Sequence, residues 1–387
     1  MIARDRHQMA QILSDRMTRT YTTLSERQEL EPDTSLVKTY MVEAHLSASA
    51  EPSQAQNLAR SAFSPAAFGK ASHVKIYTSG EPTLLSVEAT VKSEQVTIYV
   101  DFTNSRYWVL HSMASSDAAD WMIDRLVSSG PDLDRAWLPA DFLESISQLG
   151  SFRGLNLDYD RRVVPDVDFQ SPHVPVEFLK MQLWGNKAGD VLEILRKKGA
   201  FPHETTLSKV KVKFSLDEAT NEEFSLDDIK YDGKVTARGT SFLSHIGLVS
   251  RVYETYAEQI QNLEKKYALR RNTCGDRLSL EGSPINFLFD RPIANLEVFS
   301  QCLFSCGEPF RLWGVPLRLA DDFFRVNAVD LHVGSPLQFE IAPDFMRVYL
   351  PTGSCGNTIV RLYTNLQHHY DSLVRAVDGD ERNVFDF

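Results

Sequence analysis

Apolar and polar residues alternate along three regions of this chain, and each region leads through a short turn into helical spacing. Alternation predicts half-buried strands, whereas apolar residues at every third or fourth position predict an amphipathic helix. The strand regions are residues 83–112, 207–238 and 325–350, and the helices that follow them are 117–127, 242–269 and 357–377. Each helix is expected to cover one face of the sheet formed just before it.

This pattern predicts an α+β fold of three consecutive antiparallel-sheet-plus-helix units, which are candidates for pseudo-repeats. A length of 387 residues exceeds what one hydrophobic core usually supports, so three domains are reasonable. A proline-rich stretch at 164–176 marks the first boundary, and residues 47–56 resemble a surface connection. The predicted domains are an N-terminal α+β domain with a peripheral helix at 1–165, a central hairpin and long-helix domain at 166–282, and a C-terminal α+β domain at 283–387. Whether the three sheets are separate or continuous stays open.

Composition narrows the class of protein. Apolar residues make up 43% and charged residues 24%, as in an ordinary globular chain. The net charge of −11 opposes a general affinity for nucleic acid or an anionic membrane. The sequence shows no long apolar segment, and its charged start lacks the core of a signal peptide, so we expect a cytoplasmic protein that does not bind membranes.

The cysteines do not have the spacing of a zinc site or a redox pair. In a cytoplasmic protein they are expected to be free thiols, and we predict neither a bound metal nor another cofactor. These residues are Cys274, Cys302, Cys306 and Cys355.

A lysine comb, consisting of Lys209, Lys211 and Lys213, alternates with apolar residues on one predicted strand. Alternation would place the three ammonium groups on one face, where they could follow the phosphates of a nucleic acid. The alternative is a solvated or edge strand that uses lysine to prevent pairing with other sheets. Five other basic residues could enlarge the comb into a groove, and three of them lie at the end of a helix predicted at 188–198. They are Arg196, Lys197, Lys198, Arg270 and Arg271.

A weak nuclease pattern lies in the same region. Asp217 and Asp228 could hold Mg²⁺, and Lys230 could stabilise the charge of a phosphoryl transition state. Several other acidic residues lie in the loop between the two aspartates, so chance explains this spacing equally well.

A second candidate for catalysis is Cys355, which precedes a predicted helix whose first amides could lower the pKa of a thiol. His332 and Asp330 lie two residues apart on a predicted strand and could supply a base and its orienting group. The alternative is a structural turn that caps the helix, and the flanking residues favour it because the second glycine of a nucleophile elbow is missing.

Large aromatic residues offer a third kind of candidate site, because such residues anchor protein interfaces as well as cores. They are Tyr107, Trp108, Trp121, Trp137, Trp184, Trp313, Phe323 and Phe324. Since no motif of a common nucleotide or metal enzyme is present, we predict a non-catalytic subunit of a cytoplasmic multi-protein assembly that binds a protein partner. Nucleic acid is a further candidate ligand of the basic groove, and base rates alone suggest a bacterial antiviral defence system. The alternative is an enzyme, either a metal-dependent nuclease or a thiol hydrolase.

Overall fold

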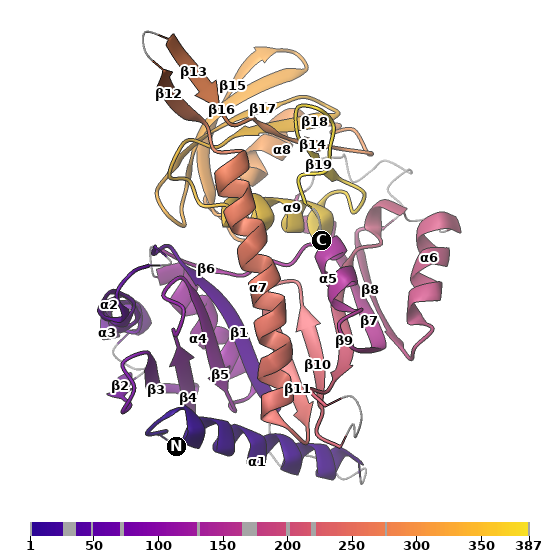
Figure 1. Ribbon diagram of the computed structural model, residues 1–387. Helices are drawn as coiled ribbons and strands as arrows, with labels where there is room; N and C mark the ends of the chain where they lie inside the picture. Colours follow the sequence, from indigo (N-terminus) through magenta and orange to yellow (C-terminus); the bar gives the residue numbers. More distant parts are fainter. Residues whose placement is uncertain are drawn as a thin grey trace. The chain divides into compact units, whose positions relative to one another are not determined.

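A computed structural model describes the fold over residues 2–25, 36–47, 49–69, 73–129, 132–164, 176–198, 202–217, 222–274 and 277–385. Helices and strands are mixed along the chain, and the strands of this described part form three antiparallel sheets (Figure 1). The predicted α+β class with antiparallel strands is therefore confirmed. That the sheet units are pseudo-repeats stays a prediction.

The chain divides into two compact units. The first consists of Met1–Ala136, Ile146–Arg153 and Val210–Glu254, and the second of Trp137–Ser145, Gly154–Lys209 and Thr255–Phe387. This division differs from the boundaries predicted near residues 165 and 282, which remain a sequence-based prediction of domain organisation. The prolines on which the first of these boundaries depends, at 165–175, lie outside the described residues.

An antiparallel sheet forms the centre of the first unit. Its strands follow the order β2-β3-β4-β5-β1-β11-β10-β9, and β6 pairs with β1. Beyond β9 the same sheet continues with β7 Ser151–Asp160 and β8 Phe178–Trp184. The strands are β1 Val37–Ala44, β2 Lys75–Thr78, β3 Leu84–Val91, β4 Glu94–Asp101, β5 Tyr107–Ser112, β6 Leu133–Arg135, β9 Leu207–Phe214, β10 Ser225–Lys230 and β11 Lys234–Gly239.

Strand β1 joins the first and second predicted strand regions. It pairs with β5 on one side and with β11 on the other, so the two regions belong to one continuous sheet. All eight residues of β1 are buried, and its sequence therefore lacks the alternation that predicted the other strands.

Helices cover both faces of this sheet. Helix α4 packs on one face through Met122 and Leu126, and helix α1 contributes Met9, Leu13 and Met17 to a second core cluster. The helices of this unit are α1 Arg6–Ser25, α2 Pro52–Ala62, α3 Pro65–Phe68, α4 Ser116–Ser129 and the beginning of α7 Phe242–Lys266. Helix α2 corrects the expectation that 47–56 is only a connection, because its buried alanines pack closely against the core.

The second unit contains a six-stranded sheet in the order β15-β16-β17-β18-β14-β19. Its strands are β14 Ile285–Leu288, β15 Leu312–Ala320, β16 Phe323–Asp330, β17 Pro336–Ile341, β18 Phe345–Tyr349 and β19 Arg375–Val377. The other elements are α5 Ala140–Ile146, β7 Ser151–Asp160, η2 Arg161–Val163, β8 Phe178–Trp184, α6 Ala188–Lys198, η3 Pro202–Glu204, β12 Arg270–Cys274, β13 Arg277–Glu281, α8 Leu296–Leu303 and α9 Asn357–His369.

Two helices of this unit test the sequence prediction. Helix α6 has the predicted bounds, whereas α9 ends at His369, well before the predicted residue 377. The chain leaves the helix there because the carboxylate of Asp371 accepts the backbone N–H groups of Asp290 and Arg291 at 2.8 and 3.1 Å. In the described part of the chain, no helix combines the length and the apolar character needed to cross a bilayer.

Candidate functional site

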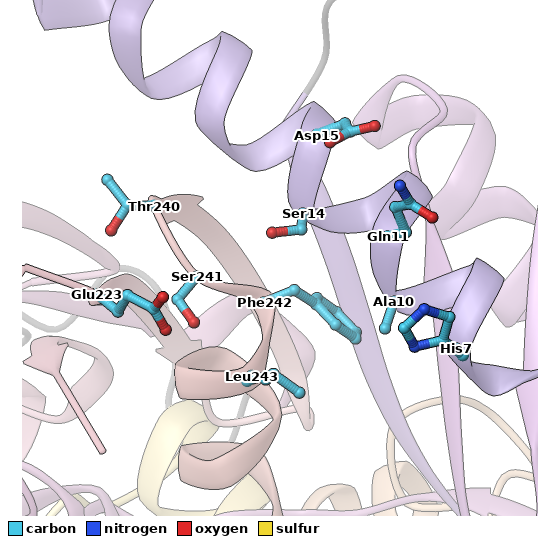
Figure 2. Close-up of a pocket in the computed structure, with 10 residues that line it drawn as sticks. All are labelled: His7, Ala10, Gln11, Ser14, Asp15, Glu223, Thr240, Ser241, Phe242 and Leu243. Atoms are coloured by element: carbon cyan, nitrogen blue, oxygen red, sulfur yellow. The ribbon is translucent and has the colours of Figure 1, made fainter. Parts of the chain in front are cut away.

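A pocket of about 420 Å³ lies between helix α1 and the start of helix α7 (Figure 2). Its lining residues are His7, Ala10, Gln11, Ser14, Asp15, Glu223, Thr240, Ser241, Phe242 and Leu243. Two of these ten side chains are carboxylates and none is a lysine or arginine, so the lining disfavours anions. His7, Gln11 and Asp15 are spaced four residues apart on α1 and are exposed, which makes the pocket shallow and open.

A chain of buried polar side chains lies behind Phe242. Its ring stands 5.3 Å from the ring of His111 and 5.5 Å from that of His245, measured between centroids. The Thr39 hydroxyl lies 2.9 Å from Nδ1 of His111 and 2.7 Å from Nε2 of His245. Nδ1 of His245 in turn lies 2.6 Å from a carboxylate oxygen of Asp227.

Burial and hydrogen bonding restrict the proton positions among these buried polar side chains. Burial and then the neighbouring His245 lower the pKa of His111 to about 3, so this imidazole is neutral near pH 7. The Thr39 hydroxyl has only one proton, so it donates to one of the two imidazoles and accepts a hydrogen bond from the other.

This arrangement resembles an acid, base and nucleophile series, but each member is at most 1% exposed. A nucleophile must reach its substrate, and the Thr39 hydroxyl is enclosed by two imidazoles. These four buried polar side chains therefore stabilise the packing of β1, β5, β10 and α7. They come from four separate elements, and no local pattern in the sequence indicates that they meet.

The lysine comb lies on β9, as predicted, but its members have different surroundings. Lys211 is buried and its ammonium lies 3.2 Å from the carboxylate of Asp228 on β10. Lys213 lies over the ring of Phe224, 4.1 Å from its centroid, and Lys209 is half-buried. Because β9 is an interior strand of the sheet, the edge-strand alternative does not describe it. Binding of nucleic acid by the comb stays a prediction.

The other basic candidates belong to α6 and β12. Arg196 forms an ion pair with Glu144 at 2.9 Å, and Lys197 forms one with Glu193 at 3.2 Å. Arg270 donates to the backbone carbonyl of Glu264 at 2.9 Å. Arg271 is exposed, and the side chain of Lys198 lies outside the described residues.

The nuclease candidates also have specific partners. Asp228 is the partner of Lys211, and the ammonium of Lys230 lies 2.7 Å from Asp232. Burial lowers the pKa of Lys230, but the charge of Asp232 outweighs this effect and raises the pKa above its usual value. Asp217 is exposed just after β9. Among the described residues, no three His, Cys, Asp or Glu side chains form a group that could hold a metal ion.

Cys355 is fully buried just before α9, and Asp330 and His332 are buried as well. Asp330 accepts hydrogen bonds from Arg361 at 2.5 Å, from Thr358 at 2.6 Å and from the backbone N–H of His332 at 3.1 Å. Burial raises the pKa of Asp330, but the charge of Arg361 outweighs it, and the pKa is lowered. Asp330 thus holds α9 against the sheet.

The described thiols agree with the expectation of free cysteines. Cys302, Cys306 and Cys355 carry no disulfide. Burial raises the pKa of Cys302, which opposes formation of a reactive thiolate. The side chain of Cys274 lies outside the described residues.

Four apolar side chains of strand β15 are exposed, and we call them the apolar stripe. Their exposed fractions are 50% for Trp313, 67% for Val315, 59% for Leu317 and 48% for Leu319. The first three alternate along the strand and so share one face, while Leu319 lies at a shift in the pairing with β16. Among the aromatic candidates, Trp108 and Trp137 are buried, so Trp313 is one of those available for an interface.

Cross-strand pairing shows what surrounds the apolar stripe. On the same face of β16, Val329 lies opposite Trp313, Asn327 opposite Val315, and Arg325 opposite Leu317. Beyond β16 this face carries polar side chains, among them Glu340 on β17 and Arg347 on β18. Arg325 and Arg347 both contact Glu340, at 3.4 and 3.2 Å. The outer face therefore has an apolar edge beside a hydrogen-bonded polar region.

Its helices and antiparallel sheets define this chain as a mixed α+β protein. The chain belongs to the MJECL33-like protein family, which it matches over residues 2–385. A relative in Methanocaldococcus jannaschii, the uncharacterized protein MJECL33, is 28% identical over 402 aligned residues. The match covers 95% of this chain and 92% of the relative, so the similarity extends over nearly the whole of both proteins.

Proposed function

We propose that this protein is a non-catalytic subunit of a cytoplasmic multi-protein assembly and that it binds a partner protein through the apolar stripe. The observation that carries the proposal is the exposure of Trp313, Val315, Leu317 and Leu319 on one strand. Single exposed apolar residues are ordinary, but a contiguous apolar patch beside polar residues is typical of a surface that another molecule covers.

The composition of the surface favours a protein as the ligand. Tryptophan is enriched among the residues that contribute most to protein–protein binding, and apolar contacts surrounded by polar groups are typical of interfaces. The hydrogen-bonded residues Arg325, Glu340 and Arg347 would form part of such a polar rim.

The alternatives have less support. A nucleic-acid groove needs cations that are available to phosphates, and Lys211 is already buried against Asp228. A thiol hydrolase needs an accessible nucleophile, and Cys355 is fully buried. Protein binding through the apolar stripe uses side chains that already face solvent.

The test is native mass spectrometry of the tagged protein, purified gently from its own host. Wild type is expected to retain a partner, and the double variant Val315→Asp, Leu317→Asp is expected to lose it, because burying two carboxylates in an apolar contact is costly. Asn327→Asp is the matched control, since it adds a carboxylate to the same face outside the apolar stripe. Circular dichroism checks that all variants are folded. Retention of the partner by the double variant would refute the proposal.

A further inference from the structure

Strand β8 is the last strand of its sheet within the described part of the chain, because the strand order ends there. It pairs with β7 over its whole length, and this pairing contains no register shift. Its seven residues include no proline and only one charged side chain, Lys180. Sheet edges are usually protected by prolines, bulges or several charges, so β8 presents an edge that accepts another strand.

The strands at the other sheet ends offer shorter edges. Strand β2 has four residues, β19 has three, and β12 and β13 have five each. The start of β15 is already used, since Cys306 donates its N–H to the carbonyl of Leu312 at 3.0 Å, and Pro316 lacks an N–H further along. Of the sheet edges in the described ranges, β8 therefore has the longest run without such an interruption.

The hydrogen bonds of β7 show which backbone groups of β8 point outward. Arg161 donates its N–H to the carbonyl of Glu177 at 2.9 Å, one step before β8 begins. Asp158 donates instead to Thr206, on the other side of β7, at 3.4 Å. Because backbone groups alternate along an antiparallel pair, odd-numbered residues of β8 face β7 and even-numbered residues face the outer edge.

A second copy of β8 matches this outer edge in one register. When two copies run antiparallel about Met181, all seven residues overlap and Lys180 lies opposite Gln182 of the other copy. Both residues face outward, so their N–H and C=O groups form a closely spaced pair of an antiparallel ladder. A shift by two residues would shorten the overlap, and in one direction it would place the two copies of Lys180 opposite each other, where like charges repel.

The exposed aromatic side chains of β8 fit the same register. Phe178 is 48% exposed and Trp184 is 62% exposed. In the symmetric pair, each Phe178 lies opposite Trp184 of the other copy, so an aromatic contact forms at both ends of the paired strands. A strand of another protein could use the same backbone groups, but this self-matching order of aromatic, apolar and polar residues favours a second copy of the chain.

We propose that the protein forms a symmetric homodimer in which two β8 strands pair antiparallel about Met181 and extend the sheet from one subunit to the other. A two-fold axis makes this contact isologous, so the same residues serve on both sides. The contact uses β8 and not β15, and it therefore does not depend on the proposed function.

Sedimentation equilibrium of the purified full chain tests the inference. Wild type is expected to be a dimer that dissociates on dilution. Gln182→Lys creates two like-charge pairs with Lys180 across the contact and should weaken the dimer about tenfold. The double variant Lys180→Glu, Gln182→Lys pairs opposite charges and should restore the dimer. Gln338→Lys is the matched control, because it adds the same charge to the interior strand β17. Circular dichroism checks that all variants are folded.

Met181→Cys tests the register itself. Opposed residues of an antiparallel pair have Cα atoms about 4.5–5.5 Å apart, which is within the range of a disulfide, so mild oxidation should link two Met181→Cys chains. Lys180→Cys should form far less of this product, because its two copies do not oppose each other. Both variants are compared with wild type, which carries the exposed Cys306.

A monomer at every concentration, an unchanged dissociation constant in Gln182→Lys, or no recovery in the double variant would overturn the inference. Equal oxidation of Met181→Cys and Lys180→Cys would overturn it as well, because the two strands would then not meet in this register.

Discussion

At one end of the six-stranded sheet in the second unit, the inner face buries charged side chains and the outer face exposes apolar ones. The inner face buries an ion pair between Asp330 and Arg361, both fully enclosed, among apolar residues such as Val326. The outer face exposes Trp313 and Val315 to solvent. Polar groups on the inside are therefore held by specific partners within the chain, whereas the apolar groups on the outside expose half or more of their surface to solvent. The buried ion pair therefore has a structural role, and the exposed apolar side chains are the candidates for a binding role.

The largest effect is expected from breaking the inner ion pair. Asp330→Ala leaves the guanidinium of Arg361 buried without its carboxylate, which should lower the free energy of unfolding by about 3–5 kcal/mol. Urea unfolding followed by circular dichroism measures the change. Asp321→Ala is the control, because that carboxylate is exposed and pairs with the exposed Arg318. A loss below about 1 kcal/mol in Asp330→Ala would mean that the pair is not structural.

A smaller effect is expected in the first unit, where polar groups are also buried. Thr39→Val keeps the shape of the side chain but removes the hydroxyl that connects His111 with His245. Leaving these groups without a partner should cost about 1–3 kcal/mol of unfolding free energy. Chemical denaturation measures it, and Thr97→Val on β4 serves as a comparison for a half-buried threonine outside the buried chain. Equal losses of unfolding free energy in the two variants would show that the hydrogen bonds of Thr39 add nothing to stability.

The pH dependence of stability sharpens the same comparison. The pKa of His111 is about 3 in the folded chain because of burial and the nearby His245, and about 6.5 when unfolded. Below about pH 6.5 the unfolded state therefore binds more protons, and stability should fall by about 2 kcal/mol between pH 7 and pH 5 from this residue. Urea titrations at both pH values are compared with those of His111→Gln, which lacks the titrating group. The same slope in both proteins would contradict the assignment.

The smallest effect on stability is expected from the outer face. Val315→Ser and Leu317→Ser remove apolar atoms that already contact water, so the free energy of unfolding should change by less than about 0.5 kcal/mol. Thermal and urea denaturation measure this change, while the partner assay described above should respond strongly. A large loss of stability would indicate that the apolar stripe is covered by the chain itself and is not a docking surface.

Part of the fold could be predicted from local sequence. Alternation located β9, β10 and β16, and charged residues before a glycine marked the end of α6. Strand β1 and the early end of α9 could not be predicted in this way. The first is buried on both faces, and the second ends because of hydrogen bonds to the distant residues Asp290 and Arg291.

The candidate sites show the same limit. The sequence placed Lys211 in an alternating row, but only the register of β9 beside β10 put Asp228 within reach of its ammonium. Trp313 was one of eight comparable aromatic residues, and nothing in its neighbours along the chain indicated which of them would face solvent. Thr39 and Asp227 carried no local signal at all.

By itself the sequence determined the α+β class, the antiparallel strands and the absence of a familiar catalytic motif, since periodicity and motifs are properties of neighbouring residues. Only the tertiary structure decided that β1 joins two strand regions, that Asp330 and Arg361 meet inside, and that the apolar stripe remains outside. Burial and pairing depend on residues far apart along the chain. The same alternating strand can therefore bury either face, and the elements packed against it select which one.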